Sequence, residues 1–458
     1  MDSYKLEKEK FVSNLTGSSM LELAFLTMSI PSLAVLRHTT SSNSIAGGSL
    51  KKTDDAVAES RSLKTYLTTL CLDYLVIVLP VTSFSSVLAD RTYIGSFVIA
   101  LFTLISVAAK RYKIGGSSLS FHGDSSSVRA YISSFRFIVM IITCGCILAV
   151  DFRIFPRRFA KTETYGTSLM DLGVGSFVVL NSLVSRQARN ITSTGWKTAV
   201  QSIIPLIVLG FIRIITTTGV DYQVHVSEYG VHWNFFFTLA GISILGSVVN
   251  IPPQYSGILG SLVLVGYQLC LLCGLNNYLL SNERGTDIIS QNKEGLFSLF
   301  GYWGMYLIGV HLGNYLFFGR SSSVSKSSRW VRTRAWILCL LFWLLAVLLD
   351  RYVERVSRRM CNLPYVVMVF ANNLQIFSIL MLGDLVPGSK ISVLEEAFNR
   401  NLLPTFLLAN ILTGLINVTM NTLAASSFTA TCILIAYSFA LSIMAGIADF
   451  YGIKLKLG

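Results

Sequence analysis

Charged residues are concentrated in one short stretch of an otherwise apolar chain, from Asp151 to Asp171. Its candidate reactive side chains are Asp151, Arg157, Arg158, Lys161 and Glu163. A carboxylate can accept a hydroxyl proton, a guanidinium can bind a phosphate through two hydrogen bonds, and an ammonium can stabilise an oxyanion. Burying a carboxylate near a bilayer centre costs on the order of 2.5–3.5 kcal/mol, so an acid at its edge usually has a partner and a task. The stretch therefore predicts a polar site at a membrane boundary; the alternative is a solvated flank that anchors a helix.

A second polar cluster, residues 221–234, contains no lysine or arginine and is therefore not a cationic membrane anchor. It includes Glu228, His232, Trp233 and Asn234. An imidazole can move protons near neutral pH and an amide can hold a hydroxyl, which suits recognition of a sugar or polyol at the water boundary. Trp233 also fits the aromatic belt at membrane interfaces.

Two later loops also carry polar side chains, which include acids, amides and arginines. Asn292 and Glu294 lie in one loop, and Arg358, Arg359 and Asn362 lie in the other. Glu294 also suits the start of a helix, where a carboxylate interacts favourably with the helix dipole. An even number of apolar segments separates each loop from the Asp151 stretch, so we expect all of them on one side of the membrane.

Apolar segments that recur along the whole chain must position these clusters. Hydrophobic residues make up 52% of the 458 residues and charged residues 13%, a balance that a water-soluble globule does not need. A helix needs roughly 20 apolar residues to cross a bilayer, which predicts about 13 transmembrane helices. They are expected near 20–36, 65–89, 92–109, 131–150, 169–184, 198–218, 231–249, 255–280, 296–318, 334–350, 362–382, 402–421 and 425–448. The prediction is an all-α, polytopic integral membrane protein with a single domain over residues 1–458.

The distribution of Lys and Arg among the connections predicts the orientation. The alternate connections that end with the C-terminal tail carry more cations than the others, so we expect them on the cytosolic side. This places the N-terminus and the Asp151 stretch on the luminal side. Lys454 and Lys456 are similar to cytosolic signals for return to the endoplasmic reticulum, with a plain basic flank as the alternative.

The same composition argues against several other classes of function. The net charge of +13 does not indicate nucleic-acid binding, because no basic domain stands outside the apolar segments. Neither Gly-x-Ser-x-Gly nor a phosphate-binding loop nor the spacing of metal ligands is present, so we expect no metal site and no bound cofactor. Direct transfer between two substrates is the simpler enzymatic hypothesis.

The polar motifs resemble one known family. Ala149-Val-Asp151-Phe-x-Ile-Phe-Pro156-Arg-Arg-Phe-Ala-Lys161-Thr-Glu163 and Glu228-Tyr-Gly-Val-His232-Trp-Asn234-Phe-Phe-Phe237 closely resemble signatures of the glycosylphosphatidylinositol (GPI) inositol acyltransferases, called PIG-W in animals. The resemblance extends through Phe11-Val-Ser-Asn-Leu, Asn292-x-Glu294-Gly295, Ser357-Arg-Arg-Met-x-Asn362, Gly383-Asp384 and Asn410-x-x-Thr413-Gly414-Leu-Ile-Asn417. It covers nearly the whole chain.

The resemblance implies an activity and its substrates. The expected reaction moves a long-chain acyl group, typically palmitoyl, from acyl-CoA to the inositol 2-hydroxyl of glucosaminyl-phosphatidylinositol in the endoplasmic reticulum membrane. Acyl-CoA is then a co-substrate, and the partners are membrane lipids. The family's catalytic pair corresponds to Asp151 and Lys161.

Specific roles follow as hypotheses. Asp151 would accept the hydroxyl proton, Lys161 would orient Asp151 or stabilise the oxyanion, and Arg157 or Arg158 would bind the lipid phosphate. His232 would help to hold the headgroup and is the alternative base. The other expected substrate contacts are Glu163, Glu228, Trp233, Asn234, Asn292, Glu294, Arg358, Arg359 and Asn362.

Two alternatives remain open. A lipid or solute carrier without acyl transfer would use Asp151 and Lys161 to gate a path. An acyltransferase of the membrane-bound O-acyl type would depend on a buried histidine in place of Asp151. Because acyl-CoA is made in the cytosol, a luminal site also requires either an inward cavity for the CoA or the opposite topology.

Overall fold

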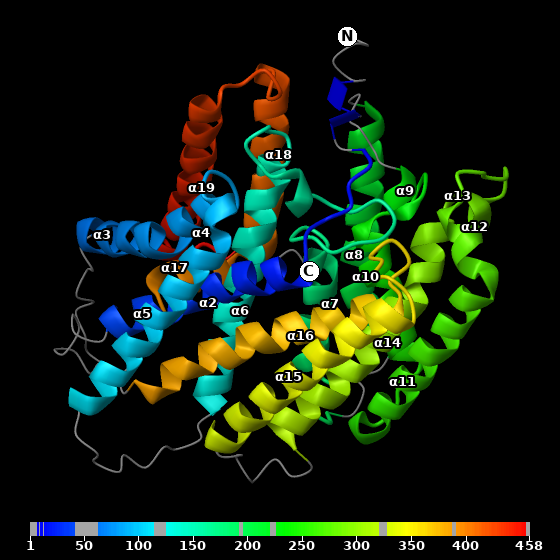
Figure 1. Ribbon diagram of the computed structural model, residues 1–458, viewed down its shortest axis with the longest axis horizontal. Coiled ribbons are helices and arrows are strands. Elements are labelled where there is room, and N and C mark those ends of the chain that lie inside the picture. The colour runs from blue at the N-terminus through cyan, green and yellow to red at the C-terminus, as the bar shows by residue number, and fades with distance from the viewer. Residues whose placement is uncertain are drawn as a thin grey trace. The chain divides into compact units, whose positions relative to one another are not determined.

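The computed structural model describes residues 7–8, 10–11, 13–41, 63–113, 125–191, 196–219, 226–319, 328–386 and 391–454 (Figure 1). The chain divides into two compact units. Unit 1 contains residues 1–20, 157–374 and 457–458, and unit 2 contains residues 21–156 and 375–456. Both units combine segments that are far apart in the chain, and the expectation of a single domain stays a prediction.

Unit 1 consists of helices and short helical turns around one central helix, α14. Its elements are η3 (Arg157–Phe159), α7 (Leu172–Leu183), α8 (Trp196–Gly219), α9 (Val226–Tyr229), α10 (Phe235–Val248), α11 (Pro253–Cys270), η4 (Leu271–Leu275), α12 (Asn276–Leu280), α13 (Ile288–Gln291), α14 (Lys293–Gly313), η5 (Asn314–Phe318), α15 (Ser328–Tyr352) and most of α16 (Leu363–Leu380). Helix α14 packs against α11, α7 and α10. A Cβ at Gly260 of α11 would lie 2.9 Å from the Gly304 carbonyl oxygen of α14, so small residues let these two backbones approach closely.

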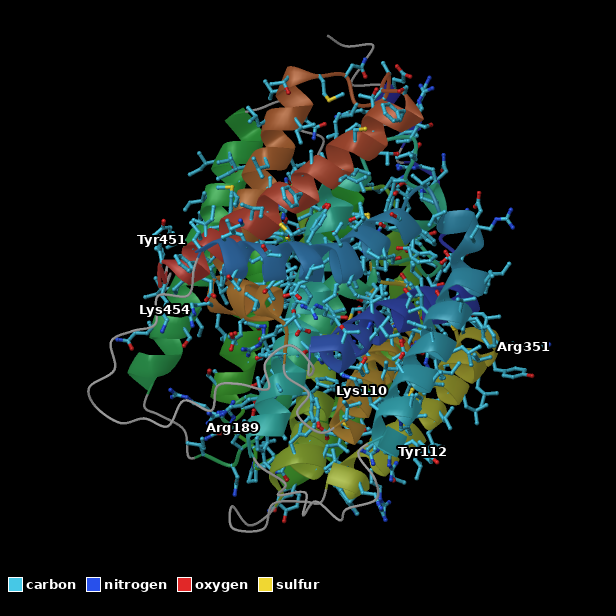
Figure 2. The ribbon with its side chains drawn as sticks, turned by 90° about the vertical axis from the view of Figure 1, so that its left-hand side faces the viewer. Lys110, Tyr112, Arg189, Arg351, Tyr451 and Lys454 are labelled. Carbon is cyan, nitrogen blue, oxygen red and sulfur yellow. The ribbon has the colours of Figure 1, made fainter. Side chains whose placement is uncertain are left out.

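The connections of unit 1 gather at two opposite ends of its helices. At one end, the Gln187 side chain donates to the Ile251 carbonyl at 2.8 Å, and the Asn314 side chain donates to the Ala188 carbonyl at 2.9 Å. The polar loops that the sequence singled out lie at the other end. Figure 2 shows Arg189, at the first end, well separated from Arg351. Arg351 lies in the last turn of α15, directly before the loop that carries Arg358 and Arg359. Ion pairs bring these loops together within unit 1, and their common side of the membrane stays a prediction.

Unit 2 is a second helical assembly held by buried ion pairs. Its elements are α2 (Met20–Ser41), α3 (Leu63–Asp73), η1 (Tyr74–Val78), α4 (Leu79–Phe84), η2 (Ala89–Arg91), α5 (Thr92–Lys113), α6 (Ser125–Ala149), η6 (Met381–Leu385), α17 (Val393–Arg400), α18 (Leu402–Thr419) and α19 (Ser427–Phe450), with the end of α16. Arg37 pairs with Asp73 at 2.6 Å, and His38 pairs with Glu395 at 2.7 Å. These contacts fix the short helix α17, whose Leu394 amide also donates to Asp73.

The all-helical, many-span fold is confirmed for the described residues, but the count of about 13 spans is not. Ten described helices are long and apolar enough to cross a membrane, and no strand is present among the described residues. The expected segments 169–184, 198–218 and 231–249 contain the shorter apolar helices Leu172–Leu183, Val200–Thr216 and Phe235–Val248. Helix α7 has only 12 residues, which rise about 18 Å at 1.5 Å each, less than the hydrocarbon thickness of about 30 Å.

Candidate active site

An ion pair joins the first two polar motifs in unit 1. Lys161 follows the turn η3, and Glu228 lies on the one-turn helix α9. The Lys161 ammonium donates to both carboxylate oxygens of Glu228, at 2.8 and 3.0 Å. The Lys161 side chain is 41% exposed, whereas that of Glu228 is 17% exposed. The pair therefore presents an ammonium at the surface and keeps the carboxylate beneath it.

Arg358 extends this pair into the interior. Its Nε donates to Asp171 Oδ1 at 2.8 Å, and its Nη1 donates to Glu228 Oε1 at 3.3 Å. Asp171 also accepts from the hydroxyl of Thr162 at 2.8 Å. Lys161, Glu228, Arg358 and Asp171 thus alternate in charge along one line, which we call the charge chain. Only its Lys161 end is open, because the side chains of Arg358 and Asp171 are 3% and 1% exposed.

The charge chain favours the ionised forms of Glu228 and Arg358, whereas burial raises the pKa of Asp171 above its ordinary value. Burial alone would raise the pKa of the Glu228 carboxyl, but the Lys161 ammonium and the Arg358 guanidinium outweigh it and lower this pKa to about 2. Burial disfavours the charged form of Arg358, yet Glu228 and Asp171 raise its pKa above the ordinary value. At neutral pH Glu228 is therefore a counter-ion and a poor general base. Its effect is to hold Lys161 in place.

This arrangement predicts a pH-dependent stability. The pKa of Glu228 falls from 4.5 to about 2 on folding, so its contribution is complete above pH 4.5 and is lost as the pH falls through about 2. The melting temperature of the solubilised wild-type protein should fall more steeply over this window than that of Glu228→Gln. Equal slopes for the two proteins in thermal melts would contradict the assignment.

A second group of ions fixes the neighbouring loops. Glu294, at the start of α14, accepts from Arg284 at 2.6 Å and from Arg359 at 2.8 Å. Lys293 is fully buried, and its ammonium donates to the carbonyls of residues 278, 281 and 283. The adjacent Arg358 and Arg359 therefore have different partners. Lys293 was not among the candidate residues, although the sequence places a lysine directly beside Glu294 at an expected helix start.

Asn362 and Glu354 shape the loop that carries the two arginines. The Asn362 side chain accepts from the amides of Ser357 and Tyr365 and donates to Glu354 and to the carbonyl of Arg355. Both donors and both acceptor positions of this amide are in use, which gives Asn362 a structural role.

The second polar motif is held largely by its own hydrogen bonds. Asn234 caps α10 by accepting from the Phe236 amide at 3.0 Å, and its side chain donates to the carbonyl of Gly210. The Trp233 indole donates to the Thr238 hydroxyl at 3.0 Å. Asparagine before an apolar run is a common helix cap, so local sequence could have indicated this role.

His232 has an exposed side chain next to this cap. Its backbone amide donates to the buried side-chain oxygen of Asn292 at 2.8 Å. Asn292 thereby joins the second motif to the loop before α14, and the His232 ring stays accessible beside the charge chain's loops.

The remaining residues of the first motif belong to different units. Asp151 belongs to unit 2, follows α6, and accepts from the Asn417 amide of α18 at 2.7 Å. The Arg157 guanidinium lies 3.9 Å from the centre of the Phe11 ring, and that of Arg158 lies 5.1 Å from the Phe159 ring, both in unit 1.

The pairing of Asp151 with Lys161 stays a prediction, because these two residues belong to different units. Glu163 is partly buried, and its amide donates to the carbonyl of Leu15. Asp171 had been noted in the first motif without a role, and no local spacing links it to Arg358, which is 187 positions away.

These observations define an integral, multi-pass membrane protein with a group of ionised side chains at one end of a helical unit. Comparison with known proteins gives the family. The family model described as GWT1 matches residues 4–448. The chain belongs to the GWT1 family, and the resemblance found in its motifs is confirmed.

Named relatives cover almost the entire chain. The chain is 34% identical to the phosphatidylinositol-glycan biosynthesis class W protein of Dictyostelium discoideum, over 99% of each chain. It is 35% identical to the GPI-anchored wall transfer protein 1 of Schizosaccharomyces pombe, over 99% of this chain and 100% of the relative. It is 55% identical to a protein of Arabidopsis thaliana described as uncharacterized, over 89% of this chain and 92% of the relative.

Proposed function

We propose that this protein acts in GPI-anchor biosynthesis as an acyltransferase that acylates the inositol 2-hydroxyl of glucosaminyl-phosphatidylinositol. The donor is a long-chain acyl-CoA, and the membrane is that of the endoplasmic reticulum. Family membership supports the pathway. The structural observation that supports acyl transfer is the exposed Lys161 ammonium, held by Glu228 at the open end of the charge chain.

The chemistry assigns one step to each of two residues. The Asp151 carboxylate takes the proton of the inositol hydroxyl as its oxygen attacks the thioester carbonyl. The Lys161 ammonium stabilises the oxyanion that forms on the carbonyl oxygen. Collapse of this intermediate breaks the carbon–sulfur bond, and the CoA thiolate takes the proton from Asp151. The products are the acyl-inositol lipid and CoA, and no other reactant is needed.

The surrounding cations and the membrane provide the binding contacts. Arg157 and Arg158 are partly buried beside the motif, and one guanidinium binds the lipid phosphate through two hydrogen bonds. His232 is exposed where its amide joins the loop before α14, and it contacts the sugar headgroup. The acyl chain remains in the hydrocarbon phase, where its burial requires no water-filled cavity.

A transfer assay separates the three candidate activities. Purified protein is incubated with labelled palmitoyl-CoA and glucosaminyl-phosphatidylinositol, and the acylated lipid is measured. Transfer that depends on Asp151 supports this function. Movement of lipid without transfer supports a carrier, and transfer that is lost only on substitution of His232 supports the membrane-bound O-acyl type.

We also propose a luminal position for the site loops and the N-terminus, with the C-terminus cytosolic; Lys456 lies outside the described residues. Arg351 and Arg189 are exposed at opposite ends of unit 1 (Figure 2). In a background without exposed cysteines, Arg189→Cys in sealed microsomes should react with a membrane-impermeant maleimide, and Arg351→Cys should react only after permeabilisation. The reverse pattern would place the site in the cytosol.

A further inference from the structure

We propose that the segment Leu15–Ser18, which we call the N-terminal strap, is a positioning element that clamps the loop 161–167 and thereby sets the place of the Lys161 ammonium. The proposal rests on the acyltransferase function above, because it assigns Lys161 its task. The strap and the loop both belong to unit 1, although more than a hundred residues separate them in the chain.

Backbone hydrogen bonds join the strap to both ends of the loop. The Ser18 amide donates to the Thr167 carbonyl at 2.6 Å, and the Thr167 hydroxyl donates to the Ser18 carbonyl at 2.6 Å. Nearer Lys161, the Glu163 amide donates to the Leu15 carbonyl at 3.3 Å. These bonds attach the loop at two places, four residues apart.

Two glycines allow the strap and loop to touch backbone to backbone. Gly17 and Gly166 have φ values of 82° and 132°, in a region that side chains disfavour. A Cβ on Gly17 would overlap the Thr167 carbonyl oxygen, and one on Gly166 would overlap the Thr16 carbonyl oxygen. The contact therefore leaves no space for a side chain at either position.

Thr162 transmits this contact to Lys161. A Cβ on Gly17 would also lie 2.8 Å from the Thr162 methyl group, so the strap packs directly against this residue. On its other side, Thr162 donates its hydroxyl and its amide to Asp171, the inner end of the charge chain. Thr162 is 2% exposed, whereas the side chain of its neighbour Lys161 is 41% exposed.

Two contacts therefore fix the position of the Lys161 side chain. Glu228 holds the ammonium at its end, and the strap holds the backbone from which the side chain extends. A displacement of about 1 Å in a catalytic group can cost roughly 100-fold in rate. Loosening the backbone of the loop should therefore lower turnover without removing a reactive group.

Gly17→Ala is the direct test, with Gly452→Ala as its matched control. Both glycines have positive φ, 82° and 67°, but a Cβ at Gly452 would meet nothing within 4 Å. We expect Gly17→Ala to lower kcat at least tenfold and to change KM for palmitoyl-CoA less than twofold, with Gly452→Ala within twofold of wild type. A Gly17→Ala enzyme as fast as the control would overturn the proposal.

Thr167→Val provides a second test that adds no steric clash. It removes the hydroxyl that donates to Ser18 and nearly preserves the volume of the side chain. We expect a three- to tenfold lower kcat at normal abundance. The position of the loop is followed separately by the labelling rate of Lys161→Cys with a charged thiol reagent, which should rise at least fivefold when Thr167→Val is added.

These measurements distinguish failure of the clamp from failure of the proposed function. An unchanged labelling rate refutes the clamp, whatever reaction the protein catalyses. If wild type transfers no acyl group, the acyltransferase proposal fails while the labelling result still decides whether the strap holds the loop.

Discussion

Asp151→Asn should abolish most acyl transfer while leaving the protein folded. A general base contributes roughly 100- to 10,000-fold to a rate, and an amide cannot accept the hydroxyl proton at neutral pH. The abundance should stay near normal, because the amide oxygen of the variant can still accept the hydrogen bond from Asn417 that Asp151 accepts at 2.7 Å. The measurement is formation of acyl-inositol lipid in microsomes, normalised to the amount of protein.

Asp90→Asn is the matched control for this substitution. Asp90 is an exposed acid of the same unit, on the short turn η2. Its replacement removes the same charge at an exposed position outside the first motif, so transfer should remain within twofold of wild type. Normal turnover by Asp151→Asn would remove the base assignment, and equal losses in both variants would show that net charge rather than position matters.

Arg358→Met should cause the largest loss of stability, because it leaves a carboxylate buried without its cation. Arg358 is 3% exposed and contacts both Asp171 and Glu228. Glu228 keeps Lys161 as a partner, but Asp171 keeps only neutral donors such as Thr162. Removing one member of a buried pair typically costs about 3–5 kcal/mol. We expect a much lower melting temperature in detergent and a low yield of monodisperse protein.

Two further variants test this explanation. The first is Arg355→Met, three residues from Arg358 in the same loop. The Arg355 side chain is 70% exposed, and its Nε lies 3.7 Å from Asp350 Oδ1. An exposed pair contributes only about 0–1 kcal/mol, so its melting temperature should change little. Adding Asp171→Asn to Arg358→Met removes the stranded charge and should recover part of the lost stability. Equal effects of Arg355→Met and Arg358→Met would contradict the charge chain.

The sequence could predict the helical fold because the signal for a spanning helix is local. Uninterrupted apolar runs must satisfy their backbone hydrogen bonds internally, and each expected run folds as helix in the described residues. The number of full crossings depends on more than composition. Helix α7 is apolar, but it begins only after Asp171, whose carboxylate is the buried partner of Arg358, and it ends at Leu183.

The sequence also identified which loops carry the polar groups, and the motifs indicated the family. It did not identify their partners. Lys161 and Glu228 are 67 residues apart, and nothing in the spacing of either motif connects them. Likewise, it did not indicate that the Asn234 side chain caps α10 and donates to Gly210; the expected substrate contact of Asn234 stays a prediction.

By itself, then, the amino-acid order determined the all-helical, many-span class of fold, the loops that carry the polar groups and the family to which the chain belongs. Tertiary structure alone decided that Glu228 holds Lys161, that adjacent arginines face different acids, and that the N-terminal strap covers the loop 161–167. The physical reason is the separation along the sequence over which each interaction acts. Hydrophobicity acts on each segment separately, whereas an ion pair or a glycine contact requires two distant segments to meet in one register, which depends on how all the helices pack.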